Sequence, residues 1–151
     1  MVASILSVSI FLLPLLQLSL ETTVKIGVLL MTEAPEPFDL RRTGPALQIG
    51  FDIASSQYGI NFEVVYHNYT GFCPKETAIG HMSELYYRDN VKAIIGPACS
   101  ATIVAAGRLA QYLKLPMVTG LGDLVVRDEI NDDMYETLTI LSYNLGKLSS
   151  K

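Results

Sequence analysis

The chain has 151 residues, with 11 basic and 15 acidic side chains and a formal net charge of −4 at pH 7. This length allows one domain at most after an N-terminal leader is set aside. The acidic balance, with no basic cluster beyond Arg41-Arg42, argues against nucleic acid as a partner.

Residues 1–20 form an apolar leader. They contain no Lys, Arg, Asp, Glu or His, and the run Ile5–Leu16 is interrupted only by two serines and one proline. A membrane-spanning helix needs roughly 20 apolar residues, so this run is short for an anchor and is typical of a signal peptide. An uncleaved membrane anchor is the alternative. We therefore expect the chain to enter the secretory pathway.

The residues after the leader alternate between strand and helix patterns. We predict strands over Val24–Leu30, Asn61–Tyr66, Lys92–Ile95 and Leu115–Thr119, a fifth strand within Tyr135–Tyr143, helices over Pro45–Tyr58, Pro74–Asp89 and Ser100–Lys114, and loops over Met31–Arg42 and Gly120–Asp133. Thr43 or Gly44 is expected to cap the first helix, with Pro45 in its first turn, and Gly59 to end it. Four strand-to-helix steps indicate a parallel α/β sheet with right-handed crossovers.

The segment Ala93–Ser100 reads A-I-I-G-P-A-C-S, which predicts a short buried strand, a tight turn at Gly96-Pro97 and a helix that begins at Ser100. Ligands of doubly wound sheets collect at such strand-to-helix junctions. The first turn, Ser100-Ala101-Thr102, offers unpaired backbone N–H groups beside two hydroxyls, so a carboxylate or a halide is a candidate ligand. Ordinary N-capping by Ser100 is the alternative.

Two short features fit an oxidising compartment. Cys73 and Cys99 are the only cysteines, and in a chain with a leader they suggest one disulfide, two free buried thiols being the alternative. Asn68-Tyr69-Thr70 is an acceptor sequence for N-glycosylation in a polar stretch. We therefore expect a secreted or extracellular glycoprotein.

Several kinds of chemistry lack their sequence patterns. The first strand runs into M-T-E-A-P-E-P-F in place of a G-x-G-x-x-G turn, and no P-loop sequence occurs. His67 and His81 have no metal-ligand spacing, so we predict ordinary histidines and no metal site. Ser100 lies outside a G-x-S-x-G context, and the acidic residues between 123 and 133 lack a calcium-loop register. We therefore expect a binding protein and no enzyme activity.

Together, these segments resemble the receptor family ligand-binding region, which has the type I periplasmic-binding-protein fold, and within it the ectodomains of receptor-type guanylate cyclases. The resemblance covers roughly residues 24–148. Its most specific part is the G-P-x-C turn that ends at Cys99, with Cys73 upstream. The other matching segments are K-I-G-V-L-L from Lys25, T-G-P-A-L-Q-I-G-F-D-I-A from Thr43, L-P-M-V-T from Leu115 and Y-E-T-L-T from Tyr135.

The resemblance implies an α/β fold, an incomplete doubly wound parallel sheet that forms the first half of the membrane-distal lobe. The corresponding division is 1–20 signal peptide, 24–148 partial receptor ligand-binding domain and 149–151 truncated tail. The family's first ectodomain disulfide falls on Cys73 and Cys99. Natriuretic-peptide receptors of this family hold chloride at a G-P-G-C turn, so chloride is the one candidate ion, although Ala98 stands here in place of that glycine.

Family members are dimers, and the resemblance places the contact on the outer faces of the first two helices, including Tyr86 and Tyr87. Packing of these tyrosines on their own helix surface is the alternative. No other cofactor is implied.

The implied function is that of an extracellular ligand-binding and dimerisation lobe. It would be non-catalytic itself and would couple an extracellular peptide or small-molecule ligand to cGMP signalling in the full receptor, whose membrane span and cyclase domain lie outside these residues. One alternative is an amino-acid-sensing receptor or solute-binding lobe of the same fold, with the ligand carboxylate held by Ser100 and Thr102. Another is a truncated secreted decoy. Because the chain supplies half a sheet and half a cleft, we expect marginal stability in isolation.

Overall fold

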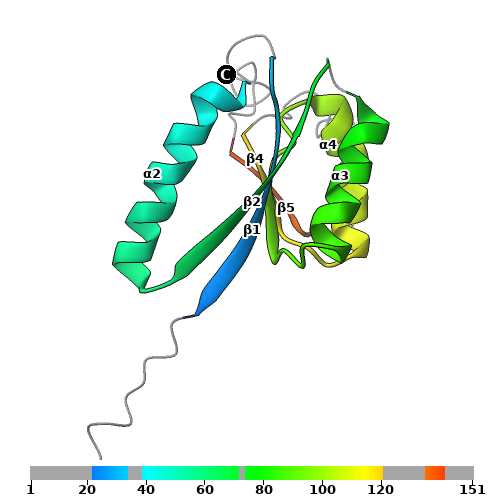
Figure 1. Cartoon of the computed structure of the whole chain (residues 1–151). Helices are drawn as coiled ribbons and strands as arrows, with labels where there is room; N and C mark the ends of the chain where they lie inside the picture. The colour runs from blue at the N-terminus through cyan, green and yellow to red at the C-terminus, as the bar shows by residue number, and fades with distance from the viewer. Residues whose placement is uncertain (1–21, 34–38, 72–73, 121–134, 142–151) are drawn as a thin grey trace, which may run out of the picture.

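Strand β1 (Thr23–Met31) is the first element and is paired on both of its edges. Residues 26–31 are all buried, as expected for an apolar, β-branched run in a parallel sheet. The computed structural model describes residues 22–33, 39–71, 74–120 and 135–141. The other elements in these ranges are, in chain order, α2 (Leu40–Tyr58), β2 (Asn61–Tyr69), α3 (Lys75–Tyr87), β3 (Ala93–Ile95), α4 (Ser100–Tyr112), β4 (Met117–Thr119) and β5 (Leu138–Ile140) (Figure 1).

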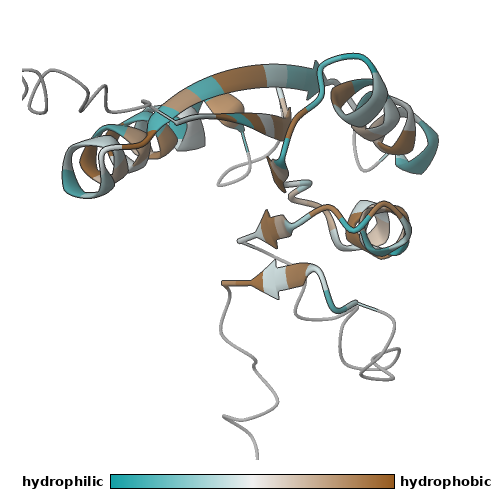
Figure 2. Cartoon of the chain, turned by 90° about the horizontal axis from the view of Figure 1, so that it is seen from below, coloured by the Kyte–Doolittle hydropathy of each residue, from teal (hydrophilic) through white to brown (hydrophobic). Residues whose placement is uncertain are grey.

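The described strands form one parallel sheet in the order β2-β1-β3-β4-β5. Helix α2 lies on one face of the sheet, and α3 and α4 lie on the other (Figure 2). The prediction of a doubly wound parallel α/β sheet is confirmed. Because β2 and β3 flank β1 on opposite sides, the winding of the chain reverses between β1 and β3, which makes this the topological switch point of the sheet.

The hydrophobic core lies between the sheet and the layer of α3 and α4. Leu29, Ile94 and Met117 fill it from three strands, and all are fully buried. Helix α3 contributes Ala78, Met82 and Leu85, which follow one another at intervals of four and three residues and so lie on one face of the helix.

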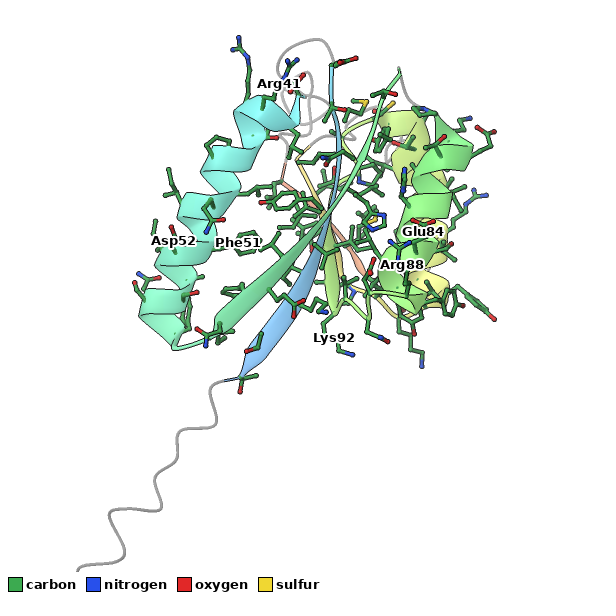
Figure 3. All side chains as sticks on the ribbon, viewed as in Figure 1. Arg41, Phe51, Asp52, Glu84, Arg88 and Lys92 are labelled. Atoms are coloured by element: carbon green, nitrogen blue, oxygen red, sulfur yellow. The ribbon has the colours of Figure 1, made fainter. Side chains whose placement is uncertain are left out.

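Helix α2 is attached to the opposite face much more loosely. None of its residues is buried, and Ile49 and Ile53 are 61% and 52% exposed. Its main described contact is the pair Phe51–Phe62, whose ring centroids lie 5.2 Å apart; Figure 3 shows Phe51 on the sheet side of the helix and Asp52 on the other. The face of β3, β4 and β5 next to α2 carries no described helix (Figure 2).

Most predicted boundaries lie within two residues of the observed ones, and two are wrong by three residues or more. Helix α2 begins at Leu40, five residues before Pro45, because Asp39 caps it by accepting a hydrogen bond from the backbone N–H of Arg41 at 2.8 Å. Strand β2 continues to Tyr69, since Leu29, Leu30 and Met31 of β1 supply pairing partners for its last residues. The C-terminal prediction for α2 is confirmed, with Gly59 in the left-handed conformation at a φ of 64°.

Several predictions fall outside the described residues. They are the signal peptide of residues 1–20, Cys73, most of the acidic loop and the tail of residues 149–151. In the part of the chain that is described, no helix combines the length and the hydropathy needed to cross a membrane.

Candidate functional site

A pocket of about 450 Å³ opens at the carboxyl ends of β1, β3 and β4, beside the first half of α2. Ligand sites of open α/β sheets lie in this position, at the topological switch point. Its described lining comes from four elements and the residues that follow them. These residues are Leu30 of β1; Ile95 of β3 with Gly96, Pro97 and Ala98 after it; Val118 and Thr119 of β4 with Gly120 after them; Thr43, Ala46 and Leu47 of α2; and Leu141 after β5.

Gly96 shapes the floor of the pocket. Its φ is 100°, a conformation that side chains rarely adopt, and a Cβ atom there would lie 2.0 Å from the carbonyl oxygen of Leu29. The chain can therefore pass close to the end of β1 at this point only because residue 96 has no side chain. The predicted tight turn at Gly96-Pro97 is not found, because residues 96–98 form no turn and the Gly96 N–H donates to the carbonyl of Val118.

The lining is mostly apolar, and its two hydroxyls already donate within the protein. The Thr119 hydroxyl donates to the carbonyl of Pro97 at 2.7 Å, and the Thr43 hydroxyl donates to the carbonyl of Asp39 at 3.3 Å. The Thr43 oxygen can also accept a hydrogen bond, whereas Thr119 is 1% exposed. The pocket is therefore suited to a ligand with an apolar body and a donor group.

The first turn of α4 differs from the expectation in two ways. Cys99 is the N-cap residue and makes no side-chain cap hydrogen bond, so Ser100 is the first helical residue and not the cap. Thr102 is fully buried, and its hydroxyl donates to the carbonyl of Cys99 at 2.7 Å. Ser100 and Ala101 are half-buried. Ser100 is therefore the one hydroxyl of the predicted pair that keeps access to solvent.

Tyr69 lies behind this turn at the end of β2 and is 3% exposed. Burial raises the pKa of its phenol, against a smaller opposing effect of the Thr102 hydroxyl. Tyr69 therefore stays neutral and acts as part of the core. Its neighbour Asn68 is exposed on the same strand, so the glycosylation prediction meets an accessible side chain.

Cys99 is disulfide-bonded in the structure. Its predicted partner, Cys73, lies outside the described residues, so the pairing of the two stays a prediction. The tyrosines of the predicted dimer surface stack edge to face on α3, with ring centroids 4.9 Å apart. Tyr87 is 67% exposed, whereas Tyr86 packs against the core.

The sequence predicts ordinary histidines at positions 67 and 81 and does not indicate that they meet in the fold. His67 of β2 and His81 of α3 lie side by side, with their Nδ1 atoms 3.3 Å apart, and Glu84 lies within 3.6 Å of both. The alternation of β2 could have indicated this contact, because His67 shares a strand face with Val65 and Tyr69, which pack in the core beneath α3. Local ligand spacing does not detect such a pair.

The sheet, its winding and the pocket at the switch point define a ligand-binding lobe of the periplasmic-binding-protein type. The profile of the "Receptor family ligand binding region" matches residues 45–148. The chain belongs to this family.

Curated relatives of the chain are guanylate cyclases. It is 33% identical over 93 residues to the receptor-type guanylate cyclase gcy-20 of Caenorhabditis elegans, covering 62% of this chain and 8% of that protein. It is 30% identical over 135 residues to gcy-14 of the same organism, covering 84% and 12%. It is also 26% identical over 97 residues to guanylate cyclase 2G of Rattus norvegicus, covering 62% and 9%. The chain thus spans about a tenth of these relatives.

Solved structures of solute-binding proteins share the fold. An ABC-type branched-chain amino acid transporter protein of Rhodopseudomonas palustris matches with a TM-score of 0.64 and 16% identity, covering 82% of this chain and 33% of that one. LivJ of Streptococcus pneumoniae, solved with isoleucine, matches with a TM-score of 0.56 and 23% identity, covering 81% and 34%. Both support the fold of this chain and say nothing further about its ligand.

Proposed function

We propose that this chain is part of the extracellular ligand-binding lobe of a receptor guanylate cyclase. The observation that carries the proposal is the apolar pocket at the switch point of the sheet, in a member of a receptor ligand-binding family whose curated relatives are guanylate cyclases. The chain itself is non-catalytic in this proposal. Ligand binding in the lobe changes its orientation in the whole receptor, and that change controls cGMP synthesis by a cyclase domain elsewhere.

The pocket sets the size of the ligand. A volume of about 450 Å³ holds a small organic molecule or one or two side chains of a peptide. Apolar walls from Leu47 and Val118 supply contact area, and the hydroxyl oxygen of Thr43 accepts a hydrogen bond from the ligand. In this proposal the ligand is an extracellular peptide or small molecule.

The transcript gives the first test of this proposal. Its sequence past codon 151, at the 3′ end, should continue into a cyclase domain.

Filling the pocket gives the second test. In cells that express the full receptor, Ala46→Trp should abolish the ligand-dependent rise in cGMP, while the amount of receptor at the cell surface should be unchanged. Gln57→Trp, on an exposed position of the same helix, is the matched control.

A normal cGMP response from Ala46→Trp would contradict the assignment of this pocket. A transcript that stops at codon 151 would contradict the receptor role and favour a secreted decoy.

A second function is an amino-acid-sensing or solute-binding lobe. It is favoured by the position of Ala98, which lines the pocket two residues before α4 begins at Ser100, so that an amino-acid carboxylate could meet the free N–H groups of that helix. Calorimetry with a panel of amino acids separates the two functions, because binding that is lost in Ser100→Ala supports this one.

We also propose that the outer face of α3 joins two copies of the lobe in the full receptor. Tyr87 is exposed beside Tyr86, and exposed aromatic side chains are enriched in protein interfaces. Tyr87→Lys should convert the dimer to a monomer in sedimentation velocity. Tyr112→Lys is the control, since Tyr112 is 81% exposed on α4; equal dissociation by both variants would contradict a specific contact at Tyr87.

Passage through the secretory pathway has its own test. Asn68 is exposed, so the secreted chain should carry a glycan that peptide N-glycosidase removes, with a drop in apparent mass. Asn68→Gln should run at the deglycosylated mass. A wild-type chain that does not change on enzyme treatment would contradict glycosylation at this position.

A further inference from the structure

Two histidines and a glutamate meet at the edge of the sheet, on the opposite face from the pocket of α2. His67 comes from β2, the edge strand, while His81 and Glu84 lie three residues apart on α3. We refer to these three residues as the edge cluster. Figure 3 shows Glu84 beside Arg88 at this end of α3.

The three possible ligand atoms of the edge cluster form a nearly regular triangle. His67 Nδ1 lies 3.3 Å from His81 Nδ1 and 3.3 Å from one carboxylate oxygen of Glu84, and that oxygen lies 3.6 Å from His81 Nδ1. Zinc binds nitrogen and oxygen ligands tetrahedrally at about 2.0–2.2 Å, which separates neighbouring ligand atoms by about 3.3–3.6 Å. The triangle therefore has the size of one face of a zinc tetrahedron.

A carboxylate also holds the outer side of His67. Its Nε2 atom lies 3.1 Å from the Oδ2 atom of Asp89. A histidine that ligates a metal commonly donates its other ring N–H to a carboxylate, which fixes the tautomer and turns the free lone pair toward the metal. With Nε2–H donated to Asp89, the lone pair of His67 lies on Nδ1, inside the triangle. The His67 side chain is 10% exposed, so its ring is held by packing as well.

Arg88 is the group that opposes a metal ion here. Its Nη2 atom lies 2.9 Å from His67 Nε2 and 3.3 Å from Asp89, and its Nη1 atom lies 3.5 Å from Glu84. The guanidinium has donors only, so while Nη2–H donates to His67 Nε2, the lone pair of the ring lies on Nε2 and not on Nδ1. Metal binding therefore requires Arg88 to leave Nε2 and Glu84, so that Nε2–H can donate to Asp89. The Arg88 side chain is 59% exposed and can turn into solvent.

We propose that the edge cluster binds one zinc ion through His67, His81 and Glu84, with Asp89 as the positioning partner of His67. The three protein ligands leave a fourth coordination position open. Water fills that position in the isolated chain. The site is separate from the pocket and does not depend on the proposed receptor function.

Titration with cobalt and zinc tests the site. The full chain is purified without a polyhistidine tag, stripped with a chelator and titrated with Co²⁺, whose visible absorption is intense in tetrahedral coordination. We expect one equivalent to bind, with displacement by Zn²⁺ and a rise in the thermal midpoint because the ligands converge only in the folded chain.

Variants assign the ligands. His81→Gln should weaken binding by more than about 100-fold, and Asp89→Asn by about 10–100-fold, as expected for an outer partner. Arg88→Gln should bind more tightly than the wild type, which a merely structural role of this arginine would not produce. Glu76→Gln, in the exposed first turn of the same helix, is the control for Glu84→Gln. The His81 side chain is 29% exposed, so its variant should keep the far-ultraviolet circular dichroism of the wild type.

Two results would overturn the proposal. One is the absence of both saturable one-to-one binding and a zinc-dependent rise in the thermal midpoint. The other is wild-type affinity in His81→Gln and Glu84→Gln, which would place any bound metal elsewhere on the chain.

Discussion

Gly96 is the residue whose replacement should do the most local damage. An added Cβ atom would lie 2.0 Å from the backbone oxygen of Leu29, and the backbone of the substituted residue would have to keep a φ of 100°. We predict that Gly96→Ala lowers the free energy of unfolding by more than about 3 kcal/mol, because a backbone clash and an unfavourable conformation act together. Chemical denaturation measures the change.

Gly80 provides a matched control for that substitution. It lies within α3, and an added Cβ atom would have no neighbour within 4 Å. Gly80→Ala should stabilise the protein by about 1 kcal/mol through helix propensity. If the two variants unfolded at the same denaturant concentration, the steric role of Gly96 would be refuted.

Single residues also show where sequence reasoning stops. The inward positions Ala78, Met82 and Leu85 follow from helical periodicity, which is a local signal. The contact between His67 and His81 does not, because it depends on how α3 crosses β2. The same holds for Thr102, whose hydroxyl is predicted to face a ligand and is instead turned to the carbonyl of Cys99.

At the scale of elements, the N-terminus of α2 is stabilised by the contact between Asp39 and Arg41. Two hydrogen bonds from the Arg41 side chain and one from its backbone N–H hold the pKa of Asp39 well below its usual range. This carboxyl therefore takes up a proton less readily in the folded chain. The stability that it contributes is present above its ordinary pKa of about 3.9 and is lost as the pH falls below that value.

We predict that the thermal midpoint falls on acidification below about pH 4 and that Asp39→Asn flattens this dependence. Asparagine is also a good N-cap, so the variant keeps the cap and removes the titrating group. Circular dichroism melts across this pH range measure the effect. Asp52→Asn, exposed on the same helix, should retain the dependence of the wild type; a change equal to that of Asp39→Asn would point to general charge effects.

The attachment of α2 to the sheet rests largely on Phe51 and Phe62. Removal of a fully buried phenylalanine costs about 3–5 kcal/mol, so the half-buried Phe51 should cost about 2 kcal/mol in Phe51→Ala. Amide hydrogen exchange should then quicken in α2 and stay slow in α4. Ile53→Ala, at a position that is 52% exposed, should change neither quantity much.

The order and type of the elements could be predicted from hydrophobic patterns, and so could the end of α2 at Gly59, but two other boundaries could not. Pro45 marks a favourable first turn, yet the helix starts at Leu40 because the side chain of Asp39 satisfies an N–H group there. Strand β2 gains three residues from a partner strand that lies far away in sequence. Both differences come from contacts that a local pattern does not contain.

At the scale of the whole molecule, helices cover the two faces of the sheet unevenly. The core between the sheet and α3 and α4 is closed, whereas α2 buries no residue and Tyr66 of β2 is 40% exposed. We predict that the isolated chain unfolds in urea over a broad range with a low m-value and binds a hydrophobic dye before the transition. A steep two-state transition without dye binding would show that the described packing is sufficient by itself.

The position of β2 at the border of the sheet has a consequence for how the protein behaves at high concentration. One side of this nine-residue strand pairs with β1, and no described strand pairs with its other side, so its backbone groups there can pair with an extended segment of another chain. Asn68 lies near the carboxyl end of the strand. A glycan on that asparagine would shield the unpaired edge of β2 and hinder aggregation by strand addition. This protective role would be independent of any ligand.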